Sequence, residues 1–264
     1  MKILTQNIWT PLVGSENDIM RIDTFASAVT NYDVIMVQEV FIFTMFCLRL
    51  WGHDLYLETK LRENGFQYFL KGKKASWMQN NGLFVASKYP LELISELNFP
   101  DREDDEMFTR KGALIFKIKE SEFRKDPVFI NTHLHCGDGN PLYEKIRFNQ
   151  LMQISKELYA KNITSDIILG GDLNINGLSG NRSNEREYRN LVGIYGTMHD
   201  PLRLTDYVTC PPDARLDYLL LINNDYLWFE NPNVVILGQS DDLPNGISDH
   251  YGVEVDLVSC DSFS

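Results

Sequence analysis

Short apolar runs that are typical of β-strands recur along the whole chain, and they constrain the fold more than any other feature of the sequence. Ten such runs are bounded mostly by turn-forming residues: 2–8, 33–39, 82–87, 91–97, 112–118, 127–133, 166–171, 215–222, 233–238 and 251–258. Their length and their content of β-branched and aromatic residues favour strands. A chain with so many strands folds into extended sheets rather than isolated hairpins.

Two longer segments with helical periodicity lie between these runs, at 18–31 and 140–162. In the second segment Asn140 suits the N-cap position and Pro141 suits the first helical turn. Five apolar residues of that segment fall on one predicted helix face: Leu142, Ile146, Leu151, Ile154 and Leu158. Because short turns join some strands and helices join others, we expect an α/β sandwich with both antiparallel and parallel strand pairs.

The length and charge of the chain narrow its organisation and partners. The 264 residues suit a single domain, 1–264, without repeats or linkers. Aspartate and glutamate outnumber lysine and arginine by 37 to 25, giving a net charge of −12 that repels polyphosphates, so long nucleic acids are disfavoured partners. The densest acidic run, 101–106, is typical of a solvated loop. We expect a monomer.

The sequence predicts neither a zinc cluster nor a disulfide framework nor an export signal. The four cysteines are widely spaced and form no CxxC pair: Cys47, Cys136, Cys210 and Cys260. The first residues, "MKILTQNIW", pass directly into a strand-like run without the apolar core and cleavage site of a signal peptide. We therefore expect a soluble protein, cytoplasmic or peripheral to a membrane, and leave secretion of a processed form open.

The longest apolar tract, "VFIFTMFCLRLW" at 40–51, is interrupted by Arg49 and is too short for a transmembrane helix. Two interpretations remain. A core helix is the favoured one, because isolated apolar runs usually pack inward. The other is an aromatic surface that rests in a lipid interface, which gains support if the substrate is a lipid. Exposed aromatic residues such as Trp77 are further candidates for such contacts.

Unusual polar residues stand at the ends of several predicted strands, as in "DIILGGDLNIN" at 166–176. Eight residues share this feature: Asn7, Glu39, His133, Asp172, Asn174, Asp217, Asp249 and His250. Each alone has an ordinary structural explanation, as a turn former, a cap or a satisfied core histidine. If the strand ends share one edge, however, these side chains converge in one cleft.

The chemistry of this set suggests phosphoester cleavage. Carboxylate and amide oxygens without thiolates suit a hard divalent cation, Mg²⁺ or Mn²⁺, that also binds a phosphate oxygen. A histidine whose tautomer is fixed by an aspartate can deprotonate water. A second histidine or an asparagine can donate to the charge that develops on the phosphoryl oxygens.

Six motifs in this order resemble the endonuclease/exonuclease/phosphatase superfamily with its deoxyribonuclease-I-like fold: "TQN" (5–7), "QE" (38–39), "NTHLH" (131–135), "GGDLN" (170–174), "RLDY" (215–218) and "SDH" (248–250). Within it the chain is most similar to the neutral sphingomyelinases, through "NNGLFVASKYPL", "RKGALIFKI", "RFNQLMQI" and "EREYRNLV". The resemblance implies a four-layer sandwich of two mixed β-sheets flanked by helices. It also implies a Mg²⁺-dependent phosphodiesterase that cleaves sphingomyelin to ceramide and phosphocholine, with a phospholipid substrate at a membrane surface.

The resemblance also implies a role for each motif residue. Glu39 holds the main Mg²⁺, for which Mn²⁺ can substitute, His250 is the general base and Asp217 orients it. His133 stabilises the phosphoryl charge, and Lys111 in "RKG" is a candidate phosphate contact. Four residues line the same cleft, where they bind a second ion or position water and phosphate: Asn7, Asp172, Asn174 and Asp249.

One departure from the family pattern concerns the substrate. The interval between Asn174 and Asp217 is shorter than in secreted bacterial sphingomyelinases, which leaves selectivity for choline undecided.

Three alternatives to a sphingomyelinase stay open. A nuclease would share the catalytic set, but it would need the basic and aromatic surroundings that the acidic balance opposes. An inositol polyphosphate phosphatase would carry an arginine shortly after Asn174 and a "CDR" triplet where "ARLDY" stands. A non-catalytic scaffold would usually lack the base or the metal glutamate, and both are present here.

Overall fold

The computed structural model describes residues 1–10, 17–46, 48–73, 78–100, 110–119, 123, 126–137, 139–178 and 182–260. The acidic run 101–106 and Trp77 lie outside these residues. Among the described helices, none combines the length and the apolar composition that crossing a membrane requires.

Two six-stranded sheets form the centre of the molecule. The first has the strand order β14 (Leu227–Val235), β15 (Gly252–Ser259), β1 (Lys2–Thr10), β2 (Val34–Val40), β7 (Phe84–Ser87) and β5 (Tyr68–Lys71). The second has the order β12 (Met198–His199), β13 (Asp217–Ile222), β11 (Ile167–Asp172), β10 (Val128–His133), β9 (Gly112–Ile118) and β8 (Leu91–Asn98).

Each sheet is mixed because it contains one strand-helix-strand crossover. The helix α1 (Asp18–Ala28) connects β1 to β2, and α3 (Pro141–Ala160) connects β10 to β11. Both of these strand pairs are parallel. The other pairs in the two sheets are antiparallel, for instance β1 with β15 and β11 with β13. The expected combination of parallel and antiparallel pairing is therefore confirmed.

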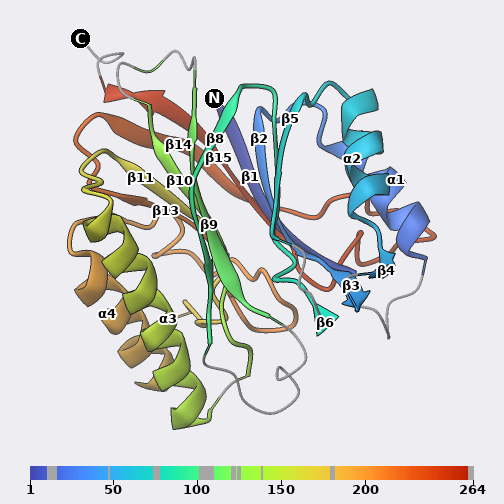
Figure 1. Cartoon of the computed structure of the whole chain (residues 1–264). Coiled ribbons are helices and arrows are strands. Elements are labelled where there is room, and N and C mark those ends of the chain that lie inside the picture. Colours follow the sequence, from blue (N-terminus) through green and yellow to red (C-terminus); the bar gives the residue numbers. More distant parts are fainter. Residues whose placement is uncertain are drawn as a thin grey trace.

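The two sheets pack face to face, and helices cover their outer faces (Figure 1). Successive residues of a strand point to opposite faces, so Ile3 of β1 packs between the sheets and Leu4 packs on the side of α1 and α2 (Asp54–Glu63). In β9 of the second sheet, Phe116 packs against the first sheet, and Ile115 packs on the side of α3 and α4 (Arg182–Tyr195). The fold is the four-layer sandwich that the sequence predicts.

The helix α3 begins as its sequence predicts. The side chain of Asn140 accepts a hydrogen bond from the backbone N–H of Leu142 at 2.9 Å, and Pro141 occupies the first turn. Four of the five predicted core residues of this helix are buried, but Leu142 is 45% exposed. Its assignment to the core is wrong because it lies in the first turn, at the end of the sandwich.

A small third sheet lies outside the sandwich and has the order β4 (Leu48–Gly52), β3 (Ile42–Met45) and β6 (Met78–Gln79). The favoured interpretation of 40–51 as a core helix is therefore wrong, because the tract forms the hairpin of β3 and β4. A continuous apolar run has no period that distinguishes a helix from a strand. Pairing with β6, a contact distant in sequence, decides for the strand.

Candidate active site

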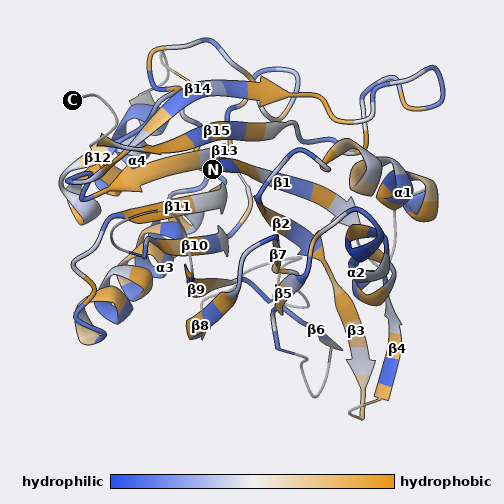
Figure 2. Ribbon diagram, turned by 90° about the horizontal axis from the view of Figure 1, so that it is seen from above, coloured by the Kyte–Doolittle hydropathy of each residue, from blue (hydrophilic) through white to orange (hydrophobic). Residues whose placement is uncertain are grey.

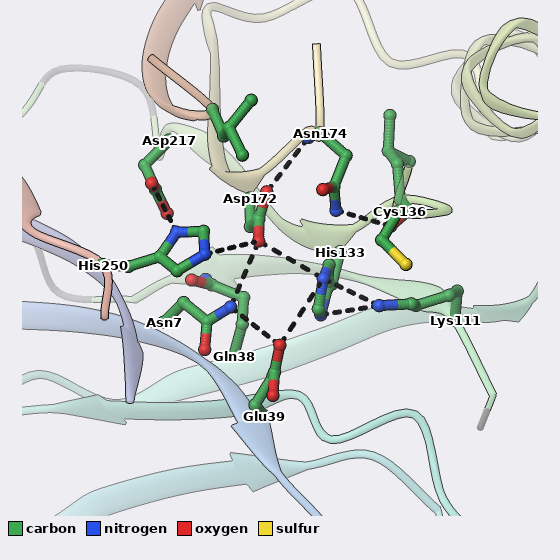
Figure 3. Close-up of polar contacts among 12 residues, drawn as sticks. Asn7, Gln38, Glu39, Lys111, His133, Cys136, Asp172, Asn174, Asp217 and His250 are labelled. Atoms are coloured by element: carbon green, nitrogen blue, oxygen red, sulfur yellow. Dashed lines mark hydrogen bonds and ion pairs between the residues drawn. The ribbon is translucent and has the colours of Figure 1, made fainter. Parts of the chain in front are cut away.

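The polar residues at the strand ends meet at one edge of the sandwich. Because β1 is parallel to β2 and β10 is parallel to β11, the carboxyl ends of each pair lie together. The register places His133 beside Asp172 in the second sheet, and Asp172 beside Asp217 of the antiparallel neighbour. Figure 3 shows Asp172 near the centre of the group, with Asn7 and Glu39 approaching from the first sheet.

His250 and Asp217 form a hydrogen-bonded pair at this edge. The distance from His250 Nδ1 to Asp217 Oδ2 is 2.8 Å, and His250 Nε2 lies 3.8 Å from Asp172 Oδ2. The backbone N–H of Asp217 donates to Thr209 Oγ1 at 3.1 Å, which fixes the start of β13. Burial lowers the pKa of His250, but the carboxylates of Asp217 and Asp172 outweigh it and raise the pKa well above its ordinary value.

Glu39 and Asp172 are two acidic side chains that one amide joins. Asn7 Nδ2 donates to Glu39 Oε1 at 2.9 Å and to Asp172 Oδ2 at 3.1 Å. The Oδ1 atom of Asn7 accepts from the backbone N–H of Trp9 at 3.0 Å. Asn7 therefore lines the cleft and donates hydrogen bonds to both acids. That Asn7 also binds the metal ion stays a prediction.

The electrostatics around Glu39 and Asp172 fit a cation. Burial raises the pKa of Glu39, and burial raises the pKa of Asp172 to about 7. Ligand atoms of Glu39, His133 and Asp172 all lie within 4.8 Å of one another. Two desolvated carboxyl groups this close are stabilised as carboxylates by a hard divalent ion, and their oxygens are the donors that such an ion prefers.

His133 contacts Lys111 in the interior of the site. The two side chains are 1% and 3% exposed, and Lys111 Nζ lies 2.8 Å from His133 Nε2. Burial and, second, the neighbouring ammonium of Lys111 lower the pKa of His133 well below its ordinary value. His133 is therefore neutral, and its approach of 3.3 Å to Asp172 Oδ2 is a contact rather than an ion pair.

Asn174 is held by two hydrogen bonds on the other side of Asp172. Its backbone N–H donates to Asp172 Oδ1 at 3.0 Å, and its Nδ2 donates to the carbonyl of Leu134 at 3.0 Å. The φ angles of Asn174 and Glu39 are 52° and 62°, in the left-handed region that non-glycine residues rarely adopt. Strained backbone of this kind concentrates at functional sites, and here it aims two predicted site residues into one cleft.

Asp249 stands apart from this group. Its side chain is exposed, and Ser248 Oγ donates to Asp249 Oδ1 at 3.2 Å. Asp249 lines a cavity of about 370 Å³ together with Trp9 and Arg21, and it is close enough to contribute to the raised pKa of Glu39. Asp249 is therefore an exposed neighbour of the group, whereas Figure 3 shows the other predicted side chains lying together: Asn7, Glu39, Lys111, His133, Asp172, Asn174, Asp217 and His250.

Five supporting residues carry no role in the sequence predictions, and Arg21 is the first. Arg21 is buried and donates to the carbonyls of Ile8, Trp9 and Ile247, so it ties the segment after Asn7 to the segment before His250. Its location in the first predicted helix gives no signal for this contact.

Gln38 and Asn131 link the two sheets beneath Glu39. Gln38 Nε2 donates to Asn131 Oδ1 at 2.7 Å, and Asn131 Nδ2 donates to the carbonyls of Val37 and Phe84 at 3.1 and 3.0 Å. Both residues are fully buried. They belong to the motifs "QE" and "NTHLH", so the motifs contained the signal although no role was assigned to these two positions.

Arg147 and Glu187 form a buried pair behind the loop that follows His133. Arg147 Nε and Nη2 donate to the two carboxylate oxygens of Glu187 at 2.9 and 2.7 Å. Arg147 Nη1 donates to the carbonyls of His135 and Gly137 at 3.1 and 2.7 Å. The pair therefore joins α3 and α4 to the loop whose Leu134 carbonyl orients Asn174. The sequence signal lies in the motifs "RFNQ" and "EREY".

Comparison with known proteins agrees with this geometry. The model of the Endonuclease/Exonuclease/phosphatase family matches residues 4–250. The chain is 27% identical over 210 residues to sphingomyelinase C from Bacillus cereus, in a match that covers 72% of this chain and 62% of the relative. It is 29% identical over 198 residues to a sphingomyelinase from Dictyostelium discoideum, in a match that covers 63% of this chain and 42% of that relative.

A solved structure shares the whole fold. The crystal structure of a mutant beta toxin from Staphylococcus aureus with bound magnesium ions aligns with a TM-score of 0.68 at 21% identity, covering 96% of this chain and 98% of that one. The matches to the two curated relatives span less than two thirds of their length. The family model, in contrast, extends from β1 to His250. The chain therefore belongs to the endonuclease/exonuclease/phosphatase family.

Proposed function

We propose that the chain is a divalent-metal-dependent phosphodiesterase of the phospholipase-C type, which hydrolyses sphingomyelin or a related choline lipid to ceramide and phosphocholine. The observation that carries the proposal is the hydrogen-bonded pair of His250 and Asp217, which faces the buried Asp172 and the half-buried Glu39. The curated relatives from Bacillus cereus and Dictyostelium discoideum, both described as sphingomyelinases, support the choice of lipid.

Glu39 and Asp172 would hold the divalent cation. Their oxygens lie at the centre of the cleft, and the raised pKa of both groups indicates a site in need of positive charge. A bound Mg²⁺ or Mn²⁺ supplies Lewis-acid polarisation of a phosphoryl oxygen and neutralises the charge of the phosphodiester. The bound magnesium ions of the Staphylococcus aureus beta toxin mutant support Mg²⁺ as the first choice. Asp249, at the rim, is a candidate for a second ion or for water.

His250 would act as the general base. Asp217 accepts a hydrogen bond from Nδ1–H of His250, so in the neutral imidazole Nε2 is unprotonated and faces Asp172 and the cleft. A cation held by Glu39 and Asp172 would offset the carboxylate charge that raises the pKa of His250 and would favour this neutral form. Water then transfers a proton to Nε2 as its oxygen forms a bond to phosphorus. The bond between phosphorus and the ceramide oxygen breaks in line, this oxygen takes up a proton from solvent water as ceramide leaves, and His250 afterwards returns its proton to the solvent.

Three further side chains would stabilise the charge on the phosphoryl oxygens. Lys111 carries a buried ammonium directly beside His133, so both can donate toward one oxygen. Asn174 is held by its hydrogen bond to Leu134 and by the left-handed backbone. Donors fixed before the reaction lose little free energy in reorganising around the transition state.

A product-release panel tests the proposal. The substrates are sphingomyelin, lysophosphatidylcholine, DNA with an abasic site and an inositol phosphate, each with Mg²⁺, with Mn²⁺ and with EDTA. The variant His250→Ala is the blank. We expect phosphocholine from sphingomyelin only when metal and His250 are both present.

The other outcomes identify the alternatives. Nicking of the abasic DNA would keep the catalytic chemistry and replace the lipid by a nucleic acid. Release from the inositol phosphate alone would indicate a phosphatase. No release from any substrate, with the fold intact by circular dichroism, would contradict the proposal and favour a non-catalytic member of the family.

A further inference from the structure

The hairpin of β3 and β4 exposes four large apolar side chains within six residues. Met45, Phe46, Leu48 and Leu50 are 38%, 72%, 67% and 53% exposed, and Cys47 between them lies outside the described residues. Single exposed apolar residues are common on protein surfaces, but a local group of this kind marks an interaction site. Leu204 and Tyr159, at 98% and 86%, are more exposed but lie far from each other in sequence and outside such a group.

The base of the same hairpin is anchored in the protein. Ile42 and Thr44 are 2% and 1% exposed. The backbone N–H of Ile42 donates to Asn80 Oδ1 at 2.8 Å, and the backbone N–H of Asn80 donates to the carbonyl of Ile42 at 3.1 Å. The hairpin is therefore a fixed projection whose tip is apolar, and Figure 2 shows β3 and β4 extending away from the two large sheets.

The tip presents no unpaired charge. Arg49 is the one charged residue between 40 and 52. Its Nη2 atom lies 2.6 Å from Asp54 Oδ1 and donates to the carbonyl of Gly52 at 2.6 Å, so the guanidinium folds back toward α2. The ionic group is thereby neutralised at the base, and the surface around Phe46 can enter an apolar medium without desolvating a lone charge.

The hairpin stands next to the candidate active site. It begins three residues after Glu39, and β2 leads directly into it. Figure 1 shows β3 and β4 at the same edge of the molecule where β1 and β2 end. A surface that contacts this tip therefore also lies near the cleft that holds Glu39.

We propose that the β3–β4 tip docks the protein onto a zwitterionic lipid bilayer, with Phe46, Leu48 and Leu50 inserted into the interface. The inference rests on the proposed function, because a lipid substrate is found in such a bilayer. Charge selects the kind of bilayer. The protein carries a net charge of −12, which an anionic membrane repels, whereas a choline-lipid surface is neutral overall.

The first experiment compares a triple variant of the tip with a double variant at exposed apolar residues outside the tip. In Phe46→Ser/Leu48→Ser/Leu50→Ser the tip becomes polar, and in Tyr159→Ser/Leu204→Ser two more exposed apolar residues are removed elsewhere. We expect the tip variant to bind phosphatidylcholine vesicles about 100-fold more weakly, since each buried aliphatic or aromatic side chain contributes severalfold to partitioning. The control variant should bind as the wild type does, and wild-type binding should weaken when phosphatidylserine is added.

Hydrolysis of a water-soluble substrate separates docking from catalysis. The tip variant should hydrolyse p-nitrophenylphosphorylcholine at the wild-type rate and vesicle sphingomyelin far more slowly. If the wild type hydrolyses neither compound while the tip variant still loses vesicle binding, the proposed function fails and the docking surface stands. If hydrolysis occurs but the tip variant binds vesicles normally, the docking surface fails alone.

A second experiment guards against misfolding of the tip variant. Phe46→Trp keeps the tip apolar, and the emission that it adds to that of the four native tryptophans should be quenched by brominated phosphatidylcholine, whereas the emission added by Leu204→Trp should not be. Absence of quenching for Phe46→Trp would overturn the proposal. So would a wild-type dimer, measured by light scattering, that the tip substitutions dissociate without changing vesicle binding, because a second copy of the chain would then cover the tip.

Discussion

Strand β2 connects the candidate active site with the β3–β4 tip, because it carries Glu39 and leads into β3. Each of these two regions reverses the usual distribution of residues. In the site, the polar side chains of Asp217 and His133 are 0% and 1% exposed. At the tip, Phe46 is 72% exposed. Buried polar groups are costly unless they are paired, and exposed apolar groups are unfavourable unless something covers them.

The difference between the two regions lies in how their cost is offset. In the site, hydrogen bonds within the protein hold the polar groups, as between Asp217 and His250 or between Asn7 and Glu39. At the tip, the folded chain leaves most of the apolar surface open. Function is therefore expected in both regions, but the site depends on internal geometry, whereas the tip depends on an external surface.

Substitution of the His250–Asp217 pair should give the largest effect. His250→Gln removes the base, and Asp217→Asn keeps the shape but removes the charge that fixes the Nδ1 proton. We expect kcat to fall about 10³-fold or more for His250→Gln and about 10²-fold for Asp217→Asn, with Mg²⁺ affinity changed little. Steady-state kinetics on a soluble phosphodiester and a Mg²⁺ titration measure these quantities. If His250→Gln kept the kcat of the wild type, His250 would not be the general base, and the buried polar groups of the site would need another explanation.

The buried Arg147–Glu187 pair tests how far the site depends on internal support. Arg147→Met removes the guanidinium that donates to both carboxylate oxygens of the buried Glu187, so the free energy of unfolding should fall by about 3–5 kcal/mol. Arg147→Met/Glu187→Leu should recover much of this loss, because no uncompensated charge remains. Denaturant unfolding measures both.

The exposed pair between the same two helices is the control. Arg186 contacts Glu144 with side-chain exposures of 56% and 11%, so solvent reaches the guanidinium of this pair, in contrast to that of Arg147. Glu144→Gln should cost no more than about 1 kcal/mol. Equal losses for Glu144→Gln and Arg147→Met would show that any link between α3 and α4 suffices, and would contradict a specific role for the loop contact.

The pH dependence of metal binding probes the electrostatics of the cleft. In the metal-free protein the pKa of Asp172 is raised from 3.8 to about 7 by burial. Because the folded pKa lies above the unfolded one, its contribution to stability is present below pH 3.8 and is lost as the pH rises through 7. The cation needs the carboxylate, so its binding releases a proton in this window.

Calorimetry in buffers of different ionisation enthalpy detects the released proton. We expect the Mg²⁺ affinity to increase by up to about tenfold per pH unit between pH 5 and 7 and to level off above that range. Asp172→Asn removes this titrating group, so its residual affinity should lose most of the dependence. An affinity that is constant from pH 5 to 7 in the wild type would contradict the raised pKa of Asp172.

Most strands of the two central sheets, and the motif residues at their ends, could be identified from the sequence for a physical reason, whereas the arrangement in two packed sheets was implied by the resemblance to the family. Buried strands show as short apolar runs, and the residue after each run stands at a sheet edge. Asn7, Glu39 and His133 could therefore be selected together. The structure places them in one cleft, while their individual roles remain predictions.

Other features could not be predicted because they depend on contacts distant in sequence. The helices α2 and α4 were missed, and so were the short strands β5, β6 and β12, whose few residues give weak local signals. The run 233–238 overlaps only the end of β14, because that strand begins earlier, at Leu227. The exposure of Asp249 and the buried contact of Arg147 with Glu187 also follow from tertiary packing.

The smallest expected effect distinguishes the tip of the hairpin from its base. Ile42 is 2% exposed, so Ile42→Ala should lower the free energy of unfolding by about 2–5 kcal/mol through loss of packing. Phe46→Ala, at a side chain that is 72% exposed, should change it by less than about 0.5 kcal/mol. Denaturant unfolding without lipid measures both. A large loss for Phe46→Ala would mean that the tip stabilises the fold itself, and its exposed apolar surface would then no longer require a partner outside the chain.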